Sequence, residues 1–418
     1  MIQIILGEYY KNKVKLIILS DKDYFNVDLY SNGKIILKID IQSHQVNLYE
    51  LDGIELGNYY YYELEYLDKI IDTFKINLKS NPFDNVLVVN CDSAYGYETG
   101  TWDSIEESNP SRYVFHLGDQ IYNDIIFQKH YNILQNKKIA DVNKNDKKKI
   151  FIDSYNYFLE QFTRNNKTNI LKNNFNIMIP DDHEVVDNSF IDRIRKDKIE
   201  IYNVIYLLIS NLSNQIELGL KYNQKDLNYI EDPINSTLYI VNYGLDFSND
   251  FFSKYDYFNK IVEYKNIIFL QRKICNSIKN KMIGQMVYLS DKFEIIDIDW
   301  LLNLCKDNKN KNFYVLCGDD HIKTTTEYYS NKDSILNVKG IGPINSVVDL
   351  LNYETILNTK IKGIEMKSDK ILENGYVKIF YKNDKINVED VINKKSYFFH
   401  VKNSILSGAK FLSFKIKK

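Results

Sequence analysis

The 418-residue sequence has few cysteines, few prolines and no long apolar run, and these shortages exclude whole classes of protein. Its four cysteines, Cys91, Cys275, Cys305 and Cys317, form no Cys-x-x-Cys pair and no dense, even framework. Neither a zinc ribbon nor a disulfide-stabilised secreted scaffold is therefore indicated. The spacing favours a reducing, intracellular compartment.

No stretch of the sequence approaches the roughly 18 apolar residues of a membrane span. The longest candidate, VIYLLIS (204–210), is better explained as the buried face of a helix. The first residues, MIQIILGEYYKNK, have no basic region ahead of their short apolar run, so no signal peptide is predicted. We therefore expect no membrane partner.

Net charge is also nearly absent, because 54 basic residues oppose 56 acidic ones and leave a formal charge of -2. A chain of this size and charge is not built to hold nucleic acid by bulk electrostatics. What is abundant is Asn, Lys, Ile and Tyr, with 34 tyrosines against 5 prolines. Since no physical demand of a fold asks for this bias, we attribute it to an A/T-rich genome.

The first 75 residues alternate strand-like runs with turn signals. The runs are VKLIILS, YFNVDLYS, KIILKIDI and QVNLYEL, separated by turns such as SNGK and LDG. Closely spaced strands without helical patterns between them favour a small antiparallel β-sandwich. Because the chain is longer than one compact core usually needs, we predict a β-sandwich domain at residues 1–80 and a larger domain at 81–418.

From residue 86 on, uninterrupted apolar strands alternate with longer amphipathic segments. The strands are VLVVN (86–90), YVFHL (113–117), NFNIMI (174–179), TLYIVNY (237–243) and NFYVLC (312–317). Strands without polar alternation are buried on both faces, as in a sheet covered by helices. Helices are predicted near 149–163, 192–221 and 291–306, with the polar run 135–149 as a loop. Late strands, such as NGYVKIFYKNDKINVED, would complete the sheet of an α/β fold.

Four of these strands end in polar residues. The residues that follow them are Cys91-Asp92; Gly118-Asp119 with Tyr122; Asp181-Asp182-His183-Glu184 with Asp187 and Asn188; and Gly318-Asp319-Asp320-His321. In open α/β sheets, ligands bind beyond the carboxyl ends of the strands. If the four strands are neighbours, so many like charges would repel strongly unless cations lie between them. The pattern therefore predicts a metal site, with two ions.

The types of side chain narrow the choice of metal. Carboxylates suit hard cations, imidazole suits borderline transition metals, and thiolate or phenolate favours an iron-like ion. A carboxylate such as Asp119 can bridge two ions roughly 3.5–4 Å apart, the spacing used by two-metal hydrolases. We expect Asp119 to be that bridge, with Tyr122 on the iron.

These blocks resemble those of the calcineurin-like metallophosphoesterases. GDQIY resembles their GDxxY block, PDDHE takes the place of their GN-H-E block, and GDDH the place of their final GHxH block. The similarity is greatest to PhoD-like alkaline phosphatases and phosphodiesterases, whose blocks run SC, HLGDYIY, DDHE and SGDxH. This sequence has NCDS, so Cys91 falls on the PhoD-type cysteine. The resemblance covers roughly residues 86–350 and implies an αββα sandwich of mixed sheets covered by helices.

The resemblance also implies a set of metal ligands. By position these are Cys91 and Tyr122 on a ferric ion, Asp119 as the bridge, Asp182, Asp187 with Asn188 as its competitor in register, Asp319 and His321. Two departures from the family pattern, Gln120 in place of a tyrosine and the additional acid Asp320, leave calcium, zinc and manganese all admissible for the second metal.

The chemistry implied is hydrolysis of phosphate monoesters or diesters by a metal-bound hydroxide at a dinuclear site. His183 would face the substrate and protonate the leaving group, with Glu184 orienting its ring. His116 and Cys317, which lie inside strands, are expected to be core residues. Two alternatives stay open: a non-catalytic, metal-stabilised descendant of the fold, or a nuclease, against which the neutral charge and the lack of a basic, aromatic groove argue.

Overall fold

The computed structural model of the chain describes most residues up to position 392. The described segments are 1–92, 101–105, 110–164, 166–186, 199–222, 227–242, 257–271, 298–318, 323–341, 359–361, 364–371, 375–382 and 385–392. Within these segments, no helix combines the length and the apolar character that crossing a membrane requires.

Residues 1–77 form two antiparallel sheets, with strand orders β1-β2-β5 and β4-β3-β6-β7. The strands are β1 (Ile2–Tyr10), β2 (Lys13–Ser20), β3 (Tyr24–Ser31), β4 (Lys34–Ile41), β5 (Asn47–Asp52), β6 (Tyr59–Tyr66) and β7 (Lys69–Asn77). In β6 the buried Tyr62 follows Tyr59 and Tyr61, which are 41% and 39% exposed. This period of two is that of a strand with one face on a core, and it accounts for the run of tyrosines.

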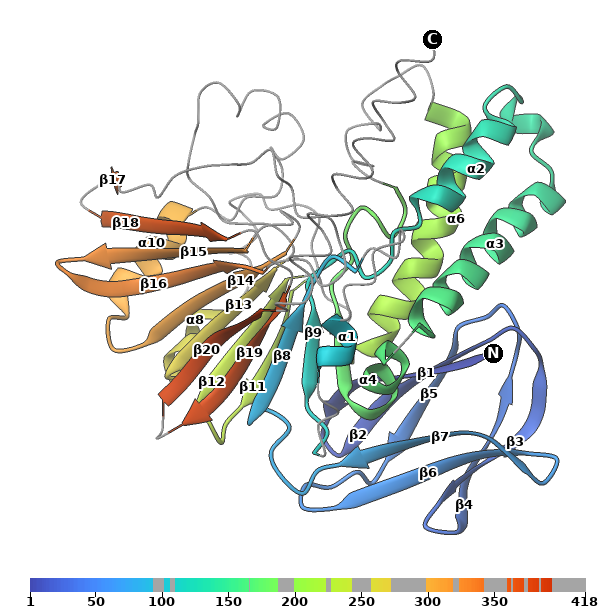
Figure 1. Cartoon of the computed structure of the whole chain (residues 1–418), viewed down its shortest axis with the longest axis horizontal. Helices are drawn as coiled ribbons and strands as arrows, with labels where there is room; N and C mark the ends of the chain where they lie inside the picture. The colour runs from blue at the N-terminus through green and yellow to red at the C-terminus, as the bar shows by residue number, and fades with distance from the viewer. Residues whose placement is uncertain are drawn as a thin grey trace.

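Two larger sheets form the rest of the described fold (Figure 1). The first has the order β10-β9-β8-β19-β20 and the second the order β11-β12-β13-β14-β16-β15-β18-β17. Their strands are β8 (Asn85–Val89), β9 (Tyr113–His116), β10 (Phe175–Met178), β11 (Leu227–Asp232), β12 (Thr237–Asn242), β13 (Asn266–Gln271), β14 (Asn312–Cys317), β15 (Lys323–Ser330), β16 (Asp333–Gly340), β17 (Thr359–Ile361), β18 (Ile364–Ile371), β19 (Gly375–Lys382) and β20 (Lys385–Ile392). The late strand β19 pairs antiparallel with β8, so the C-terminal strands extend the first sheet.

The two larger sheets pack face to face through alternate residues of their strands. Val88 of β8 and Phe115 of β9 share one hydrophobic core with Leu270 of β13 and Leu316 of β14. Ile4 of β1 belongs to the same core, so the β-sandwich and the two large sheets are not separated by a polar boundary. The part of the chain before residue 80 is therefore held to the rest by shared apolar burial.

The other residues of the same strands face outward and are covered by helices. On the first sheet, Leu87 packs with Trp102 of α1 (Thr101–Ser104) and Ile170 of α4 (Lys167–Asn173). On the second sheet, Phe269 packs with Ile261 of α8 (Tyr257–Glu263) and with residues of α10 (Ile298–Asp307). The layers thus run helix, sheet, sheet, helix, which confirms the predicted αββα sandwich.

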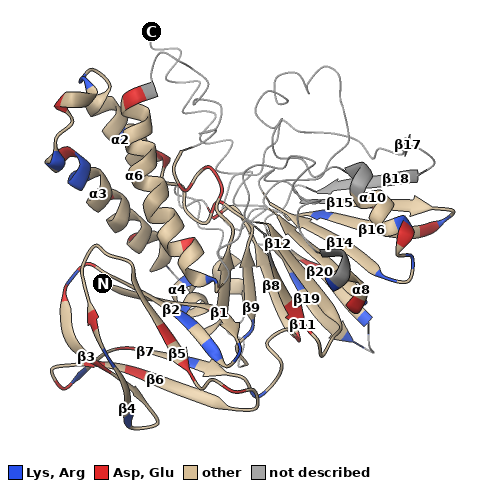
Figure 2. Cartoon of the chain, turned by 180° about the vertical axis from the view of Figure 1, so that it is seen from behind, with Lys and Arg blue, Asp and Glu red and all other residues tan. Residues whose placement is uncertain are grey.

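Three longer helices, α2 (Asp124–Leu134), α3 (Lys144–Phe162) and α6 (Ile199–Glu217), lie together beside the first sheet (Figure 1). The short 3₁₀ turns are η1 (Ile139–Asp141) and η2 (Leu218–Leu220). The view from behind shows charged residues of both signs on the β-sandwich, α2 and α3 (Figure 2).

The expectation of a loop over residues 135–149 is wrong at its end, because α3 starts at Lys144. A capping box explains the early start. The Asn143 side chain accepts from the backbone N–H of Asp146, and the Asp146 side chain accepts from the N–H of Asn143.

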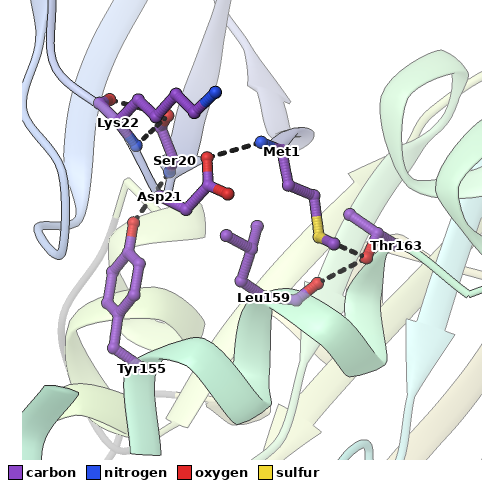
Figure 3. Close-up of polar contacts among 7 residues, drawn as sticks. All are labelled: Met1, Ser20, Asp21, Lys22, Tyr155, Leu159 and Thr163. Carbon is purple, nitrogen blue, oxygen red and sulfur yellow. Dashed lines mark hydrogen bonds and ion pairs between the residues drawn. The ribbon is translucent and has the colours of Figure 1, made fainter. Parts of the chain in front are cut away.

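Helix α3 is joined to the β-sandwich by a buried tyrosine (Figure 3). The Tyr155 hydroxyl accepts from the backbone N–H of Ser20 at 2.8 Å and donates to the carbonyl of Gln45 at 2.9 Å. Thr163, at the end of the helix, donates to the carbonyl of Leu159 at 2.8 Å. A single phenol therefore satisfies two backbone groups of the sandwich, one of them fully buried.

We predict that Tyr155→Phe lowers the free energy of unfolding by about 1–3 kcal/mol, because it leaves a buried N–H and a carbonyl without their partner. Urea unfolding measures the change. The control is Tyr157→Phe, on the same helix, whose hydroxyl makes no hydrogen bond within the described residues; its effect should stay within about 0.5 kcal/mol. Equal effects of the two changes would show that the junction does not depend on the Tyr155 hydroxyl.

Candidate metal centre

Three neighbouring parallel strands end at the same edge of the first sheet. β8 pairs with β9, and β9 with β10, both in parallel. The ladder continues beyond the strands, since Cys91 N–H donates to the Gly118 carbonyl at 3.2 Å and Asp92 N–H to the Asp119 carbonyl at 2.8 Å. The residues expected to carry the chemistry are thus brought together by backbone pairing.

Cys91 and Asp119 both adopt the left-handed backbone conformation, with φ of 49° and 53°. Such values are uncommon for residues other than glycine and cluster at functional sites. Here they turn two side chains toward each other: the Cys91 thiol lies 3.5 Å from Asp119 Oδ2. Both residues are almost fully buried, at 1% and 0% exposed.

Gly118 precedes Asp119 with φ of +107°, a value that side chains rarely allow. A methyl group on it would also lie 2.7 Å from a carboxylate oxygen of Asp181. Two features therefore favour glycine at position 118: its positive φ, and the Asp181 carboxylate, which lies where a side chain would begin.

The fourth strand reaches the same place from the second sheet. A methyl group on Gly318, directly after β14, would lie 2.8 Å from the Leu117 carbonyl and 3.0 Å from Asn90 Cβ. The ends of β8, β9 and β14 therefore touch one another. Asp319 and His321, predicted as ligands from this strand, lie outside the described residues, as do Asp320, Asp187 and its competitor Asn188.

The remaining predicted residues converge on Asp119. The Tyr122 hydroxyl donates to Asp119 Oδ2 at 3.1 Å, the same oxygen that the Cys91 thiol approaches. Asp119, Asp182 and His183 each offer a ligand atom within 4.8 Å of the others. The structure thus brings together Cys91, Asp119, Tyr122, Asp182 and His183, although they are spread over more than ninety positions.

The donor set fits metal ions. Among the described residues it combines a thiol, a phenol and two carboxylates, with the His183 ring beside them, and these ligand types suit an iron-like ion together with a harder or borderline cation. Next to the thiol, the buried Asn90 donates its amide N–H to Cys91 Sγ at 3.1 Å, and its Oδ1 accepts no hydrogen bond from the residues that the structure describes. A buried polar atom without a partner is costly unless a ligand satisfies it.

His183 is held by a carboxylate that the motifs did not indicate. Its Nδ1 lies 2.9 Å from Asp124 Oδ2, and its ring packs on the Tyr122 ring at 4.1 Å between centroids. The backbone fixes the residue too, because Asn123 N–H donates to the His183 carbonyl at 2.8 Å. Both contacts come from the start of α2, directly after Tyr122.

The expectation that Glu184 orients His183 is corrected by these contacts. Glu184 is buried, and its two oxygens accept from backbone N–H groups, that of Gln120 at 2.6 Å and that of Asp181 at 2.8 Å. It therefore joins the loop after β9 to the loop after β10. The carboxylate bonded to the His183 ring is Asp124 instead, because the loop hydrogen bonds hold Glu184 in place.

Three carboxylates lie close enough to the His183 ring to change its pKa. Burial on its own lowers the pKa of His183, but Asp119, Asp124 and Asp182 outweigh it and raise the pKa to about 11. The ring is therefore protonated in the chain without bound cations, as crowded carboxylates demand.

A second pair of acids lies behind the loops. Burial, together with the charge of Glu217, raises the pKa of Glu184. Burial also raises the pKa of Glu217, near the end of α6, to about 8. Glu217 accepts a hydrogen bond from Ser213 at 2.9 Å. Since Glu184 already accepts two N–H groups as a carboxylate, Glu217 is the member of the pair that keeps a proton.

His116 and Cys317 are buried core residues, as the sequence predicted. His116 is buried, its Nε2 lies 3.1 Å from Asn176 Oδ1, and burial lowers its pKa to about 4. Cys317 lies in the core under α10. Asp124 carried no signal in the sequence, because an acid in the first turn of a helix is ordinary there, and Glu217 carried none, because it is separated from Glu184 by 33 positions.

No protein-family model matches the chain, and no curated protein matches it. Among solved structures, PhoD aligns with a TM-score of 0.60 over 98% of this chain and 98% of its own, at 12% identity. A purple acid phosphatase, PPD1, isolated from yellow lupin (Lupinus luteus) seeds, aligns with a TM-score of 0.61 over 93% of this chain and 72% of its own, also at 12% identity. The chain therefore has the metallophosphoesterase fold, and the resemblance to PhoD-like enzymes is confirmed at the level of fold.

We predict a pH effect on the metal-free protein from Glu217. Its pKa is about 8 in the folded chain against an ordinary 4.5. The free energy of unfolding should therefore be highest below pH 4.5, where Glu217 is protonated in both the folded and the unfolded chain. It should fall by up to about 1.4 kcal/mol per pH unit as the pH rises toward 8. Glu217→Gln should remove this part of the slope in urea unfolding between pH 5 and 8.

Glu160→Gln, whose parent side chain is 55% exposed, is the control and should leave the slope unchanged. If Glu217→Gln and the wild-type chain lose stability with pH equally, Glu217 is not the group that holds the proton.

Proposed function

We propose that the chain hydrolyses phosphate esters, monoesters or diesters, at a dinuclear metal site. The observation that supports this most is the position of Asp119 among further donors. Cys91 and Tyr122 are both directed at its Oδ2, and Asp182, with His183 beside it, offers a ligand atom within 4.8 Å. A carboxylate that lies next to a thiol and a phenol and also next to a second carboxylate suits a pair of bridged cations.

The two groups suit different metals. The thiol and phenol favour a ferric ion, which Cys91, Tyr122 and Asp119 would hold. Asp119 and Asp182 suit calcium, zinc or manganese, and Asp187, Asp319 and His321 are the further ligands that the sequence pattern offers. When bound, such ions activate a water molecule and neutralise the charge on the phosphoryl oxygens.

The chain's own residues then have separable tasks. His183, bonded to Asp124 and placed beside Asp119 and Asp182, donates its proton to the leaving oxygen of the ester. Asp124 holds the ring through Nδ1, which leaves Nε2 as the atom that faces the leaving group. Glu184 keeps the loops after β9 and β10 at a fixed spacing.

A small phosphate ester is the substrate class we propose. Charged residues of both signs lie on the β-sandwich, α2 and α3 (Figure 2), which suits a small ligand better than a long polyanion. A nuclease would instead show activity on single-stranded DNA that falls steeply with salt. A non-catalytic descendant would bind metal and release no phosphate from any ester.

The first test is metal analysis of the purified protein together with its visible spectrum. We predict iron, a second metal and an absorption band from tyrosinate bound to ferric iron, lost in Tyr122→Phe. The control is Tyr131→Phe, a tyrosine of the same helix region that lies outside the site. A wild-type chain without bound metal would overturn the proposal, whereas zinc without iron would remove only the assignment of Tyr122 and Cys91.

The second test separates acid catalysis from metal binding. We predict that His183→Ala keeps its metals and loses roughly 10²–10⁴-fold in kcat on esters with poor leaving groups, with a smaller loss on esters such as aryl phosphates. Asp124→Asn should follow the same pattern with a smaller loss, because the ring stays but is less well held. Equal losses on both substrate classes would contradict the acid role, whereas loss of metal would assign His183 to the metal.

A further inference from the structure

A buried lysine lies directly behind the strand ends. Lys167, the first residue of α4, is 2% exposed. Its ammonium forms an ion pair with Asp92 and donates to the Gln120 carbonyl at 3.1 Å. Phe162 and Trp102 enclose it, with ring centroids 5.2 and 5.6 Å away. Burying an ammonium costs free energy unless protein groups replace its hydration. Asp92 and the Gln120 carbonyl provide that replacement for Lys167.

The two groups that Lys167 binds are each one residue beyond a proposed ligand. Asp92 follows Cys91 on the β8 side, and Gln120 follows Asp119 on the β9 side. Both proposed ligands have left-handed backbones. An ammonium that binds the next residue on each side holds the two turns at one distance from each other, and therefore holds the thiol and the carboxylate at theirs.

The ion pair also shows where the Asp92 side chain points. Its carboxylate pairs with Lys167 rather than joining the acids around Asp119. The sequence pattern placed Asp92 among the strand-end carboxylates, but in the structure Asp92 forms an ion pair with Lys167. One buried cation therefore serves both loops and neutralises the acid closest to Cys91 in sequence.

We propose that Lys167 is a positioning residue for the metal centre. By binding Asp92 and the Gln120 carbonyl it sets the spacing of Cys91 and Asp119 before any cation arrives. The inference rests on the proposed function, because it assumes that Cys91 and Asp119 hold metal. Residues that support metal ligands in this way typically change metal affinity by 10–100-fold when replaced.

The test is Zn²⁺ binding to the metal-free protein, measured by competition with a chromophoric chelator. Lys167→Met alone would bury Asp92 without its partner, so the variant of choice is Lys167→Met with Asp92→Asn, which leaves a neutral pair of similar size. We expect it to fold, with a thermal midpoint close to that of the wild-type metal-free chain, and to bind Zn²⁺ about 10–100-fold more weakly. Lys167→Arg, which keeps the charge but changes its reach, should give a smaller loss.

A matched control lies on the same helix. Lys172 of α4 pairs with Asp72 of β7 at 2.9 Å, with both side chains partly buried, and this ion pair joins α4 to β7 rather than to the loops that carry the proposed ligands. Lys172→Met with Asp72→Asn removes the same charges and should leave Zn²⁺ affinity unchanged.

Wild-type affinity in the folded Lys167 double variant would overturn the positioning role. If that variant does not fold, wild-type affinity in Asp92→Asn, which breaks the ion pair, would overturn it equally. A wild-type chain that binds no Zn²⁺ would instead refute the metal site, and with it the proposed function, which is a different result from a site that binds normally without Lys167.

Discussion

The carboxyl ends of parallel strands lie at one edge of a sheet, and this constraint determines which residues of this chain lie together at the candidate metal centre. Once β8, β9 and β10 run in parallel, the residues that follow them must share one small volume. The residues that lose solvation there include the thiol of Cys91 and the carboxyl groups of Asp119, Asp181, Asp182 and Glu184. Their mutual repulsion is the main cost of the arrangement.

The chain offsets that repulsion with several different partners. Backbone N–H groups satisfy Glu184, an ammonium satisfies Asp92, and an imidazolium lies beside Asp124. Asp119 and Asp182 are the carboxylates grouped with His183. The acids around the site thus fall into two kinds, those whose partners join the loops and those that lie together beside the His183 ring.

Local patterns in the sequence predicted a sheet covered by helices and polar residues at the strand ends, whereas the αββα order of the layers came from the resemblance to metallophosphoesterases. Apolar runs on both faces mark covered strands, and the polar residues after them are adjacent to those runs in the chain. The site's supporting contacts could not be predicted in this way. Lys167 and Asp92 are separated by 75 positions, and Glu184 and Gln120 by 64. Nothing near either residue in the sequence indicates its partner, since the pairing exists only in the folded arrangement.

The shared hydrophobic core bears on the order in which the protein can be made. Ile4 in the first strand and Ile379 in one of the last belong to a single apolar cluster. During synthesis the ribosome releases the first seven strands long before β19, the strand that pairs against β8, has been translated. Until then part of the inner face stays uncovered, so the nascent chain depends on its last described strands to reach a state that resists aggregation.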